Sequence, residues 1–211
     1  MLITAHGGAH GTGRNSKLYF SRIPEYECDV LEVDVRKRGN TLYIAHLPAL
    51  FPKRHLSLEY ALEKAKEYGK LINCDMKERG LVGDVIELAK KTGTEDKILF
   101  TGWVVSEEEA ENLPFGRVFF NKLSGIPFKE GNAAKIKERL GDNPRLAGIN
   151  AGKRFVSDKF LAECAEAGIA VSLYTLSSRA DAERYVKLGL YNLTCNNPAA
   201  VREVFRGYKE Q

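Results

Sequence analysis

The side chains most suited to chemistry are two carboxylates, Glu32 and Asp34, set two residues apart in the β-forming run 30–35. Side chains at positions i and i+2 of a strand point to the same face, so the two acids converge on one spot. Like charges raise each other's pKa, so such a pair favours a cation between them. A Gly-Asn turn follows at 39–40, and a second apolar run at 41–45 ends at His46, which is therefore expected near the two acids. This pattern is typical of a metal-assisted active site.

A structural explanation fits the same residues. Arg36 and Arg38 share the alternation of Glu32 and Asp34, so all four could lie on an exposed strand face as ion pairs. Both interpretations stay open on this segment alone.

Short β-forming runs alternate with amphipathic segments along the whole chain. Strands are expected at 2–5, 30–35 with its 41–45 arm, 70–76, 97–101, 118–122, 146–150, 170–176 and 191–194. Helices are expected at 15–23, 58–68, 82–91, after Ser106, and at 133–140, 157–167, 178–188 and 198–208. Strand–helix alternation without a linker predicts a (β/α)8 TIM barrel forming a single domain, 1–211, with an open doubly wound sheet as the alternative.

In such a barrel, polar residues at the carboxyl ends of the strands face a shared mouth. The residues expected there are His6, Glu32, Asp34, His46, Asp75, Lys77, Thr101, Trp103, Asn121, Lys122, Asn150, Lys153, Tyr174, Thr175 and Asn196. Carboxylates, histidines and lysines gathered in one mouth favour the functional interpretation over surface ion pairs.

Composition and charge narrow the class of protein. The chain has 32 basic and 28 acidic residues and a net charge of +4, without a basic block. Dedicated nucleic-acid binding is therefore not expected, whereas a small anionic substrate such as a phosphate ester is. The four cysteines form no C-x-x-C pair, and no apolar run reaches membrane-spanning length. We expect a cytoplasmic protein without stable membrane insertion; the oligomeric state stays open.

The residues of the expected mouth also carry a family resemblance. The sequence resembles the glycerophosphodiester phosphodiesterases, within a wider group of barrel phosphodiesterases that includes phosphatidylinositol phospholipase C. That family has His-Arg-Gly after the first strand, Glu-x-Asp in the second, a second His further on, and Glu-x-Lys in the third. The matching segments here are His6-Gly7-Gly8, Glu32-Val33-Asp34, His46 and Asp75-Met76-Lys77. Segments 168–175 and 193–198 resemble the family's Gly-x-x-Val-x-x-Trp-Thr and Thr-Asp-x-Pro, so the similarity covers nearly the whole chain.

The sequence departs from the family pattern at several positions. Gly7 stands where the family has arginine, and Arg14 stands where its acidic partner usually lies. We hypothesise that Arg14 binds the phosphate in place of the missing family arginine. The alternative is that Arg14 only flanks the first helix. Asp75 replaces the usual Glu, as in the sphingomyelinase D branch, and Tyr174 replaces Trp.

The resemblance implies a metal-dependent phosphodiesterase that cleaves a glycerophosphodiester to glycerol phosphate and an alcohol. Glu32, Asp34 and Asp75 are the implied ligands of one divalent cation, and an all-carboxylate set selects Mg²⁺ or Ca²⁺. His6 and His46 are the implied general acid and base. The candidate substrate-binding residues are Lys77, Arg14, Trp103, Lys122 and Tyr174. The alternatives are a sphingomyelinase D-like lyase acting on choline phospholipids, and a catalytically degenerate barrel that binds a phosphorylated ligand.

Overall fold

The structure, a computed structural model, describes residues 1–210 and is a closed barrel of eight parallel strands. The barrel strands are β1 (Leu2–Ala5), β2 (Val30–Arg38), β4 (Leu71–Met76), β5 (Ile98–Thr101), β6 (Arg117–Phe120), β7 (Leu146–Gly152), β8 (Ala170–Leu176) and β9 (Asn192–Cys195). β1 pairs in parallel with both β2 and β9, which closes the ring. The predicted TIM barrel is therefore confirmed, and the open doubly wound sheet is excluded.

One strand lies outside the parallel ring. β3 (Thr41–Ile44) pairs antiparallel with the end of β2, from Val35 opposite Ile44 to Arg38 opposite Thr41. Gly39, with a φ of 57°, allows the tight turn between the two strands. This hairpin is the expected 41–45 arm, and it leads directly into His46.

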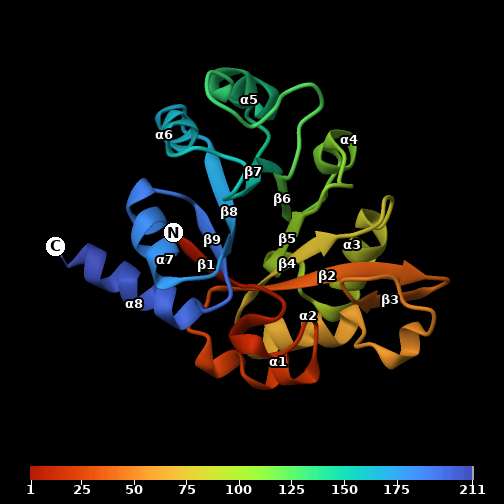
Figure 1. The fold of residues 1–211 in the computed structure, drawn as a ribbon. Helices are drawn as coiled ribbons and strands as arrows, with labels where there is room; N and C mark the ends of the chain where they lie inside the picture. The colour runs from red at the N-terminus through yellow and green to blue at the C-terminus, as the bar shows by residue number, and fades with distance from the viewer. Residues whose placement is uncertain (211) are drawn as a thin grey trace.

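Helices surround the barrel on its outside, one after each parallel strand (Figure 1). They are α1 (Lys17–Ser21), α2 (Leu58–Glu67), α3 (Val82–Thr92), α4 (Glu107–Glu111), α5 (Ala133–Leu140), α6 (Asp158–Glu166), α7 (Arg179–Tyr185) and α8 (Pro198–Lys209). Short 3-10 turns occur at Ala9–Gly11, Ile23–Glu25, Pro52–Arg54, Glu95–Lys97 and Val186–Leu188. No helix within residues 1–210 has both the length and the apolar character needed to cross a lipid bilayer.

Serine side chains begin several of these helices. Ser106 and Ser178 form capping boxes with Glu109 and Asp181, in which each side chain bonds the other residue's backbone N–H. The first helix begins later than expected, at Lys17, because Asn15 has a left-handed φ of 53° that no α-helix accommodates. Gln211, the last residue of the expected domain, lies outside the described residues.

The inside of the barrel is apolar at one level and polar at the next. Val30, Leu99 and Phe119 form an apolar layer toward the amino ends of the strands. Two residues further along, the inward positions are polar and bonded to one another. The pairs are Thr4 Oγ1 to Asn192 Oδ1 (2.7 Å), Asn192 Nδ2 to Ser172 Oγ (2.9 Å), Asn73 Nδ2 to Thr101 Oγ1 (3.0 Å) and Asn150 Nδ2 to Asn121 Oδ1 (3.2 Å). This bonded layer is the rigid floor on which the mouth of the barrel is built.

Candidate active site

A cavity of about 190 Å³ lies above this polar layer, at the carboxyl ends of the strands. Its lining residues are His6, Glu32, Asp34, His46, Asn73, Asp75, Lys77, Thr101, Trp103, Asn121, Asn150, Tyr174, Thr175 and Thr194. Every barrel strand or the loop that follows it supplies at least one of them. The mouth is therefore a single polar cup.

Three carboxylates meet in this cup. One oxygen each of Glu32, Asp34 and Asp75 lies within 4.8 Å of the other two. β2 and β4 run in parallel with Asp34 directly opposite Asp75, and Glu32 precedes Asp34 on the same face. Glu32 and Asp34 are buried, with 5% and 4% of their surface exposed. Asp75 is half-buried, and acids this close together favour a positive partner or a raised pKa.

Lys77 is the protein's own cation in the cluster. Its Nζ lies 2.7 Å from Asp34 Oδ1 and 2.5 Å from Asp75 Oδ2. Burial opposes ionisation of Asp34, but Lys77, with hydrogen bonds from Asn15 and His46, holds the pKa of Asp34 below its ordinary value. Asp75 is affected in the opposite direction: burial, reinforced by the Asp34 charge, raises its pKa despite Lys77.

Glu32 has no such direct cation. Burial, together with Asp34 and Asp75, raises the pKa of Glu32 to about 8. Its Oε2 accepts a 2.6 Å hydrogen bond from the Gly7 N–H. A Cβ at Gly7 would lie only 3.2 Å from the same oxygen, which explains why a residue without a side chain suits this position. Three clustered oxygens, one lacking a cationic partner, fit a small hard cation such as Mg²⁺ or Ca²⁺.

Asn15 orients Asp34, a role that the sequence interpretation missed. Asn15 Nδ2 donates to Asp34 Oδ2 (2.8 Å), and Asn15 Oδ1 accepts from the Asp34 backbone N–H (3.1 Å). Asn15 is buried, and its left-handed backbone turns the side chain back onto β2. The available signal was an asparagine, which tolerates this conformation, directly before a serine cap.

Replacing Asn15 should reduce both activity and stability. Asn15→Gly keeps the left-handed backbone but removes both hydrogen bonds, so we expect a stability loss of about 1–3 kcal/mol and a fall in kcat of roughly tenfold. Asn15→Ala should unfold at a lower temperature still, because alanine also resists the positive φ. Thermal melts and steady-state kinetics on both variants measure these effects. Wild-type kinetics in Asn15→Gly would refute the positioning role.

Both histidines of the site line the cup. His46 Nδ1 is 3.3 Å from Asp34 Oδ1, and nearly half of its side chain, 45%, is exposed. His6 continues from β1, with its backbone N–H bonded to the Cys195 carbonyl. Burial, with a smaller effect from the Arg14 charge, lowers the pKa of His6. Both imidazoles thus border the cavity that holds the carboxylates.

Arg36 holds the segment that delivers His46. Its guanidinium donates to the His46 carbonyl (2.8 Å) and to Glu78 Oε1 (2.9 Å). Arg38 donates instead to the Ala49 carbonyl (2.9 Å). The alternative in which these arginines pair with Glu32 and Asp34 on an exposed face is therefore wrong, because both acids turn into the barrel.

The candidate substrate-binding residues fall into two groups. Lys77, Trp103 and Tyr174 line the cup, whereas Arg14 and Lys122 do not. Arg14 is exposed and lines a separate hollow together with His6, Gly8 and Asn196. Lys122 is exposed at the rim of a neighbouring cavity. Lys153, also expected at the mouth, pairs with Asp181 at the start of α7.

The (β/α)8 barrel fold is shared with solved structures. A glycerophosphodiester phosphodiesterase from Parabacteroides distasonis superimposes with a TM-score of 0.77 at 14% identity, over 99% of this chain and 98% of that one. An Oleispira antarctica phosphodiesterase in complex with the product sn-glycerol-3-phosphate gives 0.78 at 17% identity, over 98% and 97%. A glycerophosphodiester phosphodiesterase from Agrobacterium tumefaciens gives 0.70 at 15% identity, over 97% and 98%.

No protein-family model and no curated protein matches the sequence. At these identities the structural likeness establishes the fold. The fold implied by the sequence resemblance is therefore confirmed, and the neighbours that share it over nearly their whole length include glycerophosphodiester phosphodiesterases.

Proposed function

We propose that this protein is a metal-dependent phosphodiesterase that hydrolyses a glycerophosphodiester to glycerol phosphate and an alcohol. The observation that carries the proposal is the cluster of Glu32, Asp34 and Asp75 in one cup with His6 and His46. The neighbouring structure with bound sn-glycerol-3-phosphate supports a small phosphoester as the ligand. We further propose that residues 1–211 act as one phosphodiesterase-like domain.

Glu32, Asp34 and Asp75 would hold one divalent cation, Mg²⁺ or Ca²⁺. When bound, such an ion stabilises the negative charge that develops on a phosphoryl oxygen. The Lys77 ammonium, on the same carboxylates, supplies a second positive charge at the mouth. Together with the buried walls, these charges favour an anionic substrate.

The histidines have distinct roles in this proposal. The lowered pKa of His6, caused by burial and then by Arg14, keeps its imidazole neutral near pH 7, so His6 accepts the proton of the attacking hydroxyl. Asp34 is a carboxylate that only accepts hydrogen bonds, so His46 carries its proton on Nδ1 in this contact. To act as the general acid, His46 also carries a proton on Nε2, as an imidazolium, and this second proton passes to the leaving oxygen.

Arg14 is proposed to bind the phosphate. Because its guanidinium is exposed and screened, we expect Arg14→Ala to raise KM by roughly 3–10-fold with a smaller change in kcat. Lys17→Ala, which removes an exposed cation on α1, serves as the control and should change neither constant. Unchanged kinetics in Arg14→Ala would show that Arg14 does not bind the phosphate and only flanks the first helix.

The test of the function is product formation from defined substrates. Purified protein should release glycerol phosphate from glycerophosphodiesters with Mg²⁺ or Ca²⁺ and lose this activity in a chelator. Phosphorus NMR of the products separates hydrolysis from the lyase alternative, which yields a cyclic phosphate. Absence of both products under every metal condition would overturn the proposal.

One observation favours the degenerate barrel as a second candidate. Lys77 already pairs with both Asp34 and Asp75, which places a positive charge in the cup for a phosphorylated ligand without a metal ion. Calorimetric binding of glycerol phosphate in a chelator, together with an absence of turnover in Mg²⁺ and in Ca²⁺, would support this candidate.

A further inference from the structure

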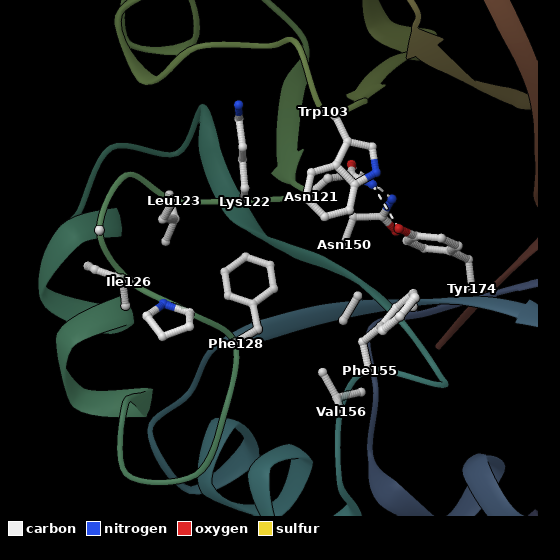
Figure 2. Close-up of a pocket in the computed structure, with 14 residues that line it drawn as sticks. Trp103, Asn121, Lys122, Leu123, Ile126, Phe128, Asn150, Phe155, Val156 and Tyr174 are labelled. Carbon is white, nitrogen blue, oxygen red and sulfur yellow. Dashed lines mark hydrogen bonds between the residues drawn. The ribbon is translucent and has the colours of Figure 1, made fainter.

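A second and larger cavity, of about 530 Å³, adjoins the catalytic cup. It lies between the loop after β6 and the loop after β7 (Figure 2). Trp103, Asn121, Asn150 and Tyr174 line both cavities. The two cavities therefore meet along these four residues, within reach of a molecule whose phosphate lies in the cup.

The walls of this cavity are apolar. Figure 2 shows Leu123, Ile126, Phe128, Phe155 and Val156 around one space, with the Trp103 indole on the opposite side. A cavity of about 150 Å³ lined by such side chains holds one benzene ring. The observed volume is therefore ample for an alkyl chain or a substituted aromatic ring.

Two aromatic rings of the cavity are held in place. Phe128 stacks on the buried Phe160 of α6, with ring centroids 6.5 Å apart. Phe155 is 78% exposed, yet its ring lies against Gly152, where a Cβ would approach to 2.8 Å. Its backbone N–H also bonds the Gly152 carbonyl at 2.8 Å. Together with the neighbouring apolar side chains, these rings form a contiguous exposed apolar patch, and such patches are typical of ligand-binding grooves.

The polar groups of the cavity lie at its boundary with the cup. Asn121 accepts from the Gly102 N–H (2.8 Å) and donates to the Tyr174 hydroxyl (3.1 Å), so its amide is already bonded within the protein. Lys122 extends from the rim, away from the phenyl rings (Figure 2). The residues that line the cavity include no carboxylate, and the nearby ammonium disfavours a cationic headgroup.

We propose that this cavity, defined by Trp103, Leu123, Ile126, Phe128, Phe155 and Val156, binds an uncharged apolar substituent of the phosphodiester. The inference rests on the proposed function and specifies its substrate class. The substituent is the alkyl or aryl part of the leaving alcohol, or a short acyl chain on the glycerol. The apolar substituent raises affinity because the cavity removes it from water.

Binding of n-alkyl phosphates in Mg²⁺, measured by calorimetry, tests the cavity without turnover. From methyl to octyl phosphate, Kd should fall by up to about fourfold per buried methylene and then level off. Phe155→Ala should raise the Kd of octyl phosphate about tenfold and leave that of methyl phosphate within twofold. Phe51→Ala removes a comparably exposed phenylalanine, 60% accessible, outside the cavity, and should change neither Kd. A Kd independent of chain length, or equal slopes in wild type and Phe155→Ala, would overturn the proposal.

Turnover then distinguishes the two sources of the chain. Glycerophospho-octanol has the chain on the leaving alcohol, and 1-octanoyl-glycerophosphomethanol has it on the glycerol. One of these two substrates should have a higher kcat/KM than glycerophosphomethanol, and Phe155→Ala should remove that gain. The chain of that substrate is then the one that occupies the cavity. A preference for glycerophosphocholine over both would overturn the choice of an uncharged group. If no diester is cleaved, the proposed function fails, while the alkyl phosphate series still decides whether the cavity binds apolar chains.

Discussion

Replacing His6 or His46 by alanine should lower kcat by about 100-fold or more in each case. General acid–base catalysis contributes roughly 10²–10⁴-fold, and both rings border the cavity that contains the carboxylate cluster. KM should change little, because the proposed proton transfers occur in the transition state rather than in substrate binding. Steady-state kinetics with a glycerophosphodiester and saturating Mg²⁺ measures both constants.

The chain supplies matched controls for this experiment. His10 Nε2 bonds Asn197 (3.1 Å) and its ring packs edge-on against Tyr26, while the ring of His55 lies near Tyr43. His10→Ala and His55→Ala should therefore keep kcat within about twofold of wild type, since surface substitutions away from a site have small effects. If His6→Ala or His46→Ala has a normal melting curve and a kcat near that of wild type, the catalytic role assigned to that histidine is wrong.

The pH dependence provides an independent readout of His6. A general base works only when it is deprotonated, and burial and the Arg14 charge lower the pKa of His6 from 6.5. The acidic limb of kcat/KM should therefore have its midpoint below 6.5, with activity falling as the pH drops through it. Arg14→Ala removes a positive neighbour, so the limb should move toward higher pH. A limb that stays in place would show that Arg14 does not act on His6.

The Glu32→Gln substitution should lower metal-dependent turnover by about 100-fold or more. It should not destabilise the protein in a chelator. The amide oxygen can still accept the hydrogen bond from Gly7. Burial, with Asp34 and Asp75, raises the pKa of Glu32 to about 8, so near pH 7 and without the ion the neutral amide replaces a mostly protonated carboxyl group. The loss of activity follows because the ion's stabilisation of the phosphoryl charge amounts to several kcal/mol.

Melting temperatures measured with and without Mg²⁺ complete this test. A ligand that binds only the folded state stabilises it, so Mg²⁺ should raise the melting temperature of wild type but not of Glu32→Gln. Asp84→Asn, on α3, changes a carboxylate that pairs with Lys37 outside the cup, and it should retain both activity and the response to Mg²⁺. Full activity of wild type in a chelator would contradict the metal site.

Much of the fold was predictable because its causes are local. Ser57, Ser106, Ser157 and Ser178 each cap a helix at the expected start, since the capping hydrogen bonds involve residues three positions apart. The predicted start of the first helix was wrong because Asn15, in the loop before Lys17, has a left-handed conformation and bonds Asp34 on β2. No local pattern contains that contact.

The barrel and the convergence of Glu32 with Asp34 were predictable from the amino-acid sequence. Both follow from short-range rules: strand alternation places residues i and i+2 on one face, and repeated strand–helix units require parallel strands. Only the tertiary structure shows that Asp34 pairs with Lys77 and not with Arg36 or Arg38, and that Glu32 has no direct cationic partner. The tertiary structure also decided that an apolar cavity opens beside the cup. These features depend on distances between side chains from different strands and loops, and such distances are set only when the sheet closes.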